Sequence, residues 1–139
     1  MGKYITDIEQ LYDGIAGLFG SLEELPDIKR KVLNTNLLLG LYYSDPEGKI
    51  LLDASGNKIK VYTGQWPDGM EPKVKLMMSA DTSHMFWLGK VNLLMATATG
   101  EIRTAGNLGG VMKLVPMLKP LFGVYVDFLN NNGMSDLVV

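Results

Sequence analysis

An apolar residue at every second position over residues 73–79, with two lysines on the opposite face, limits what this chain can fold into. Val74, Leu76 and Met78 share one face of an extended segment, and Lys73, Lys75 and Met77 share the other. A sheet with one apolar face and one charged face is stable only when other elements cover the apolar side. The rest of the chain therefore has to supply that cover.

Turn signals and apolar periodicity predict the remaining elements. Asp45-Pro46-Glu47-Gly48 and Ser55-Gly56-Asn57 separate apolar runs that have strand propensity. Apolar residues at three- and four-residue spacing indicate amphipathic helices before and after these runs. We expect strands at residues 37–43, 49–54, 58–62, 73–79 and 101–105, and helices at 3–19, 26–34, 82–88 and 91–99, the third capped by Asp81 or Thr82.

A last helical region follows Asn107, which we expect to cap it. Pro116 and Pro120 each remove a backbone donor and clash with the preceding turn, so we expect a break near residues 115–119. The tail from Met134 is expected to be loose. The predicted fold class is α/β (α+β), with a five-stranded, mainly antiparallel sheet and helices covering one face.

Length and composition exclude several classes of protein. The 139 residues fit a single domain spanning positions 1–139. A net charge of -2 provides no positive electrostatic field that would attract nucleic acid. The absence of cysteine excludes disulfides and thiolate chemistry. Asp7 and Glu9 interrupt any apolar core of a secretory signal, so we expect a cytoplasmic protein.

The sequence contains no recognisable catalytic or cofactor-binding motif. The one histidine, His84, follows Ser83, but neighbours on a helix point about 100° apart, so we expect His84 in a capping turn or on the surface. The glycines at 100, 106, 109 and 110 match neither a P-loop nor a dinucleotide fingerprint. We therefore predict no catalysis, no metal and no cofactor.

The second half of the chain resembles the sterol carrier protein type 2 family of non-specific lipid transfer proteins. The resemblance rests on a strand with an acidic cap, two short helices with glycine exits, a strand ending in Gly-Asn and a last helix. These correspond to Ser79-Ala80-Asp81, Met85 to Gly89, Leu93 to Gly100, Glu101 to Asn107 and Leu108 to Leu118. Asn107 stands where that family more often has aspartate. Pro116 and Pro120 are unusual in the family's last helix.

This resemblance implies a carrier of apolar lipids: fatty acid, fatty acyl-CoA, or sterol-like or isoprenoid molecules. Short helices broken by glycine cover a sheet poorly, so we expect an apolar cavity of roughly 300–1,000 Å³ beneath them. Ordinary core packing is the alternative for each lining residue. By face and element, we expect the ligand to contact Leu76, Met78, Met85, Phe86, Leu94, Met95, Ile102, Met112, Val115 and Phe122.

Two interactions with partners are also expected. The Lys29-Arg30-Lys31 run is either a solvated face or a site of transient contact with a membrane. The alternative function is a non-catalytic accessory module that supports a lipid- or quinone-pathway enzyme. In that case the apolar region from Leu114 to Phe128 would form a homodimer or bind a partner protein.

Overall fold

Five strands form one sheet in the order β3-β2-β1-β4-β5 in the computed structural model, which describes residues 3–139. Strands β1 and β4 run parallel, and the other neighbours pair antiparallel. The predicted mainly antiparallel sheet is therefore confirmed. The strands are β1 Leu38–Ser44, β2 Gly48–Asp53, β3 Lys60–Thr63, β4 Val74–Ser79 and β5 Arg103–Gly106.

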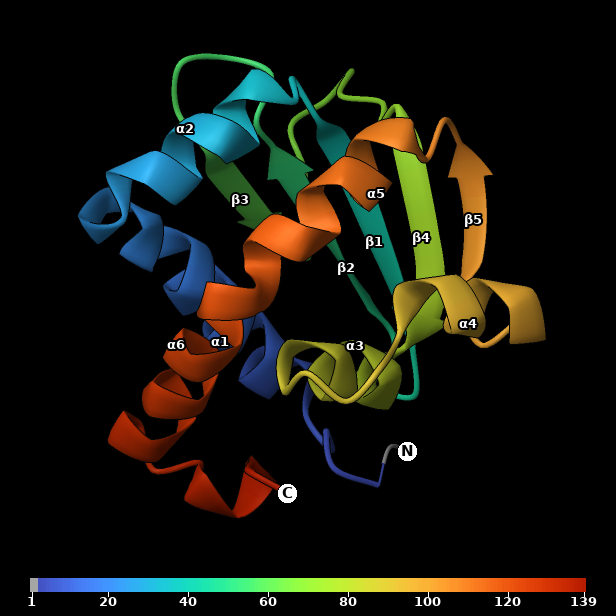
Figure 1. Cartoon of the computed structure of the whole chain (residues 1–139). Helices are drawn as coiled ribbons and strands as arrows, with labels where there is room; N and C mark the ends of the chain where they lie inside the picture. The colour runs from blue at the N-terminus through green and yellow to red at the C-terminus, as the bar shows by residue number, and fades with distance from the viewer. Residues whose placement is uncertain (1–2) are drawn as a thin grey trace.

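The helices gather on one face of this sheet, as Figure 1 shows. They are α1 Ile8–Gly20, α2 Pro26–Asn34, α3 Ala80–Trp87, α4 Leu93–Thr99, α5 Gly109–Leu114 and α6 Lys119–Asn131. Short 3-10 helices are η1 Ser21–Glu24, η2 Val115–Leu118 and η3 Ser135–Leu137. The fold is thus the predicted α/β arrangement with a cover on one side.

The burial pattern of β4 follows the alternation in its sequence. Val74, Leu76 and Met78 are buried in the apolar core, and the residues between them are only half-buried. Leu39 and Leu41 of β1 belong to the same core. The helices therefore supply the cover that the strand pattern requires.

Helix α1 begins later than predicted, at Ile8 rather than near Lys3. Asp7 and Gln10 form a capping box that fixes the first turn. The preceding backbone is held elsewhere, because the N–H groups of Lys3, Tyr4 and Ile5 donate to the Asp81 carboxylate at 2.6, 3.0 and 2.8 Å. The expectation that residues 3–7 are helical is wrong for this reason.

Helix α3 begins at Ala80, and its cap is Ser79 rather than the predicted Asp81 or Thr82. The Ser79 hydroxyl accepts a hydrogen bond from the backbone N–H of Thr82 at 3.1 Å. Since Ser79 already caps the helix, the Asp81 side chain is available to bind the N-terminal segment. One carboxylate therefore ties residues 3–5 to the start of α3.

The last helical region is broken where the prolines predicted it. Helix α5 ends at Leu114, η2 covers Val115–Leu118, and α6 starts at Lys119. The N-cap of α5 is Leu108 rather than the predicted Asn107, although the Asn107 side chain accepts a hydrogen bond from the N–H of Gly109 at 2.9 Å. The expected loose tail is wrong, because Leu137 in η3 is buried against the core.

Candidate functional site

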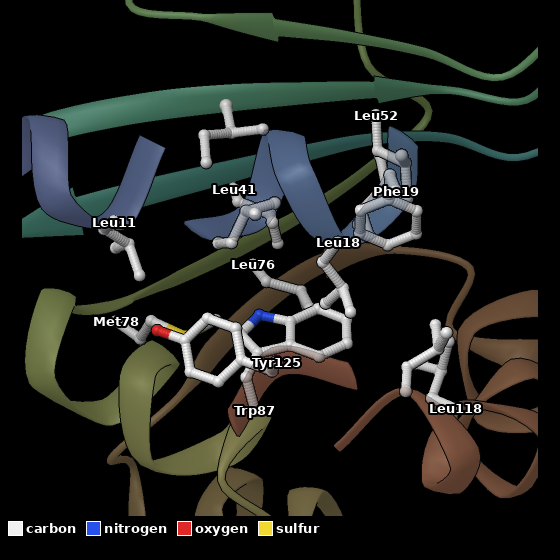
Figure 2. Packing of buried hydrophobic residues seen from close by; sticks show 14 of the residues in the cluster. Leu11, Leu18, Phe19, Leu41, Leu52, Leu76, Met78, Trp87, Leu118 and Tyr125 are labelled. Atoms are coloured by element: carbon white, nitrogen blue, oxygen red, sulfur yellow. The ribbon is translucent and has the colours of Figure 1, made fainter. Parts of the chain in front are cut away.

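A small apolar cavity lies between the inner face of the sheet and helices α1, α3, α4 and α5. Its volume is about 50 Å³. Figure 2 shows several of the side chains around it, with those of the sheet facing Phe19 and Trp87. The lining residues are Phe19, Leu39, Leu41, Leu52, Leu76, Met78, Ser83, Phe86, Trp87, Leu93, Ile102, Val111, Leu114, Val115 and Leu118.

Two short helices form one wall of this cavity. Helix α4 has seven residues, of which Leu93 and Ala96 are buried. Helix α5 has six residues, of which Val111 and Leu114 are buried. Each helix is therefore held to the rest of the protein by a narrow apolar edge.

The lining is suited to hydrocarbon and not to ions. Ser83 is the one polar residue among the fifteen that line the cavity, and no lining residue carries a charge. The Ser83 hydroxyl donates to the hydroxyl of Tyr43 at 3.1 Å. Burial raises the pKa of Tyr43, so this pair is neutral at ordinary pH.

The cavity is much smaller than the volume predicted from the sequence, which is wrong for this conformation. Aromatic side chains fill the space beneath the helices. The ring of Trp87 meets those of Phe19 and Phe86 edge to face, at centroid distances of 5.6 and 5.1 Å. Phe86 in turn meets Phe122 at 5.8 Å. A hydrocarbon chain can enter only if these elements move apart.

Half of the residues predicted to contact a ligand line the cavity. They are Leu76, Met78, Phe86, Ile102 and Val115. The other five lie on two open grooves on either side of α4. Leu94, Met112 and Phe122 line a groove of about 560 Å³, whereas Met85 and Met95 line a groove of about 580 Å³.

The first of these grooves adjoins the cavity. Phe86, Leu93 and Val115 line both spaces, so these three side chains form the wall between them. Lys90 and Lys119 also line the groove. The second groove is also lined by Lys90, together with two acidic residues, Asp81 and Glu101.

The two residues of α4 that were expected to contact the ligand, Leu94 and Met95, are each one position away from a buried residue. Leu94 and Met95 are each 65% exposed, whereas Leu93 and Ala96 face inward. Adjacent helical residues differ by about 100° in direction, so an error of one position exchanges the buried face for the exposed one. The three-residue spacing of Leu93 and Ala96 after the Asn92 cap was a signal that could have identified them.

Other cavity residues were missed although their signals were present. Leu39 and Leu41 alternate along β1, and Val111 and Leu114 have helical spacing in α5. Phe19 and Leu52 come from the first half of the chain, which contains none of the motifs that carry the family resemblance. Ser83 was considered only as a neighbour of the histidine.

His84 is wholly buried, at 0% exposure, which contradicts the predicted capping or surface position. Its Nδ1 lies 2.7 Å from the Tyr125 hydroxyl, and its Nε2 lies 2.8 Å from the Leu137 carbonyl oxygen. A carbonyl only accepts, so Nε2 donates to Leu137 and Nδ1 accepts from Tyr125. Burial lowers the pKa of His84.

The basic run in α2 is partly neutralised within its own helix and the turn before it. Lys29 pairs with Glu23 at 2.8 Å, and Arg30 pairs with Asp27 at 3.0 Å. Within residues 3–139, no group of three or more metal-binding side chains gathers at one place. No helix in that range has the length and hydropathy needed to cross a membrane.

The sequence pattern of the SCP-2 sterol transfer family matches residues 20–119, which include most of the cavity lining. The chain belongs to this family. A general role in lipid binding or transfer follows from that membership. Among curated proteins, none matches the sequence significantly.

Solved structures with this family's fold resemble the chain along most of its length. Sterol carrier protein 2 from Yarrowia lipolytica, in its apo form, has a TM-score of 0.61 and 19% identity, covering 94% of this chain and 97% of that one. Sterol carrier protein domain 2 of Helicoverpa armigera has a TM-score of 0.63 and 21% identity, covering 88% and 94%. A ubiquinone synthesis protein, UbiJ-SCP2, has a TM-score of 0.57 and 16% identity, covering 83% and 94%.

Proposed function

We propose that this SCP-2 family domain binds the hydrocarbon part of a lipid between its sheet and helices α3, α4 and α5. The observation that carries the proposal is the lining of the cavity, which is apolar except for Ser83. Each methylene removed from water contributes about 0.8 kcal/mol, so a long chain binds without many polar contacts. Fatty acids, fatty acyl-CoA, sterol-like and isoprenoid lipids all carry such a part.

Binding requires α4 and α5 to move away from the sheet. Only two residues of each helix are buried, so little apolar surface is exposed when either moves. Gly100 ends α4 with a positive φ of 81°, and Gly109 and Gly110 begin α5. Residues that tolerate many backbone conformations therefore stand where these helices meet their neighbours.

The groove between α4 and α6 is the proposed route into the cavity. It shares Phe86, Leu93 and Val115 with the cavity, so displacement of these side chains joins the two spaces. Leu94 is exposed on the border of the groove, beside the cationic Lys90 and Lys119. We expect transient membrane contact at this border rather than at the paired residues of α2.

Sedimentation with vesicles tests the site of this membrane contact. We expect the wild type to bind vesicles of phosphatidylcholine and phosphatidylglycerol, and Leu94→Ser to bind them more weakly. Lys31→Gln, on α2, is the control and should bind like the wild type. If Lys31→Gln binds vesicles more weakly than Leu94→Ser does, the membrane contact lies on α2 and this part of the proposal is wrong.

A pair of valine substitutions tests the cavity itself. Val115→Phe adds a ring at the wall between groove and cavity, whereas Val124→Phe adds one on α6, away from the cavity lining. Both overpack a half-buried position, at a typical cost of about 1–3 kcal/mol. We expect Val115→Phe alone to weaken the saturable binding of a fluorescent fatty acid, by about ten-fold or more.

Native mass spectrometry of protein purified from cells gives the complementary result. The wild type is expected to carry lipid, and Val115→Phe is expected to carry less. An empty wild-type protein that also fails to bind the fluorescent fatty acid would overturn the proposed function.

A second candidate is the accessory role, which the fold similarity to the ubiquinone synthesis protein favours. In this chain α6 already uses Leu121, Tyr125 and Leu129 to pack on its own core, which leaves Phe122 and Phe128 half-buried for a partner. Sedimentation velocity separates the two functions. A stable dimer or complex with no bound lipid would favour the accessory role, in which no catalysis is expected.

A further inference from the structure

The hydrogen bond between Ser83 and Tyr43 leaves one hydroxyl hydrogen without an acceptor. Two hydroxyl groups have two donors, and a bond between them uses only one. Among the described residues, Tyr43 Oη has no hydrogen-bond partner other than Ser83, and Ser83 Oγ has none other than Tyr43. Because the Ser83 hydroxyl donates to Tyr43, the hydroxyl hydrogen of Tyr43 is the donor that remains.

This spare donor, on Tyr43, is buried behind the wall of the apolar cavity, on the face of β1 that also presents Leu39 and Leu41 to the cavity. Ser83 is 2% exposed and Tyr43 is 5% exposed, so water does not supply the missing acceptor from outside. Ser83 lines the cavity directly, and Tyr43 lies immediately behind it at 3.1 Å. Buried donors without an acceptor are uncommon because they lose their hydrogen bond to water without replacement.

The surroundings determine which acceptor fits. No lysine, arginine or histidine lines the cavity, so an ionised carboxylate or phosphate placed there would lose its hydration with no opposite charge to replace it. An uncharged oxygen, in an alcohol or a carbonyl group, pays a much smaller desolvation cost and accepts one hydrogen bond. A bare hydrocarbon leaves the donor unused.

We propose that Ser83 and Tyr43 form a polar subsite for the neutral oxygen of a lipid alcohol or carbonyl, so that the cavity favours such lipids over bare hydrocarbon. This inference rests on the proposed lipid-binding function. The hydroxyl pair determines the orientation of the lipid, with its oxygen at α3 and its hydrocarbon along the sheet. An anionic head group instead remains outside, in the groove that Lys90 and Lys119 line.

The test compares 1-dodecanol, dodecane and dodecanoate as competitors of a fluorescent apolar reporter. The variant is the double substitution Ser83→Ala with Tyr43→Phe, which removes both hydroxyls together and leaves neither unpaired. The measured quantity is the affinity for dodecanol divided by that for dodecane. Comparing this ratio between proteins cancels the different solubilities of the two ligands in water.

We expect the ratio to fall about ten-fold in the double variant, as loss of one net hydrogen bond implies. The corresponding ratio for dodecanoate should not change, since its carboxylate does not reach the pair. Tyr125→Phe is the control, because it removes a buried hydroxyl that does not line the cavity. It should leave both ratios as in the wild type.

Each remaining outcome contradicts the inference. If dodecane and dodecanol bind but their ratio is unchanged in the double variant, the pair is only a structural contact. If the dodecanoate ratio falls instead, the head group at this subsite is anionic. If no competitor binds the wild type, the proposed function fails and this inference fails with it.

Discussion

His84 connects three segments that are far apart in the sequence. From α3, it accepts a hydrogen bond from Tyr125 of α6 and donates one to Leu137 of η3. Burial is the largest influence on its pKa and lowers it, whereas the hydrogen bond to Leu137 and the carboxylate of Asp81, one turn earlier, raise the pKa by less. The side chain is therefore neutral in the folded protein and able to charge in the unfolded chain.

We predict that His84 makes the fold less stable as the pH falls below about 6.5. Its pKa is lower in the folded state than the unfolded value of 6.5, so the unfolded chain binds more protons in this window. One such group changes stability by at most about 1.4 kcal/mol per pH unit. Urea denaturation at several pH values should show a steeper loss for the wild type than for His84→Gln, whereas equal slopes would contradict a buried neutral histidine.

Asp81 provides a second prediction for a single residue. Its carboxylate accepts the backbone N–H groups of Lys3, Tyr4 and Ile5, and hydrogen bonds to charged groups contribute about 1.5–3 kcal/mol. We expect Asp81→Ala to lower the free energy of unfolding by about that amount and to expose residues 3–7 to proteolysis. Asp127→Ala, at an exposed position of α6, is the control, and equal stability of the two variants would refute the role of Asp81.

At the scale of elements, the edge of the sheet depends on one glycine. Gly106 ends β5 with a φ of 91°, and a Cβ there would collide with the backbone carbonyl of Lys73 beside β4. Gly100 has a similar φ of 81°, but open space surrounds its missing side chain. An alanine at either position would therefore be strained by the positive φ, but only an alanine at position 106 would also collide with a neighbouring strand.

We predict that Gly106→Ala destabilises the protein by about 1–3 kcal/mol more than Gly100→Ala does, which is the usual range for overpacking. Both variants place an alanine in a left-handed conformation, so the difference between their stabilities measures the contact between β5 and β4. Thermal or urea unfolding of the pair provides the measurement. Equal destabilisation would mean that β5 shifts away without cost.

At the scale of the whole molecule, the two sides of the cavity differ in how firmly they are held. Strand β1 lies at the centre of the sheet between β2 and β4, whereas α4 and α5 each rest on two buried side chains. Local opening costs least where little apolar surface is buried. The sheet is therefore the fixed wall of the cavity, and these helices are the wall that moves.

Hydrogen exchange should reveal this difference directly. We expect backbone amides of α4 and α5 to exchange faster than those of β1, and to slow when a lipid such as 1-dodecanol is bound. The amides of β1 serve as the internal reference. Exchange of α4 and α5 as slow as that of β1, or unaffected by bound lipid, would argue against opening at this wall.

Much of the fold was predictable because its signals are local. Alternation fixed which face of β4 is buried, and Pro116 and Pro120 located the break before α6. The site was only half predictable, because an error of one residue on a short helix replaced the inward Leu93 with the outward Leu94. No local pattern shows which of two adjacent leucines a distant sheet will bury.

The sequence by itself determined the order of the elements, the apolar face of the sheet and the lipid-carrier resemblance, because each depends on residues close together in the chain. Only the tertiary structure decided the burial of His84, the hydroxyl pair of Ser83 and Tyr43, and the small volume of the cavity. These depend on contacts between residues about forty or more positions apart. Such contacts exist only after the helices have packed on the sheet.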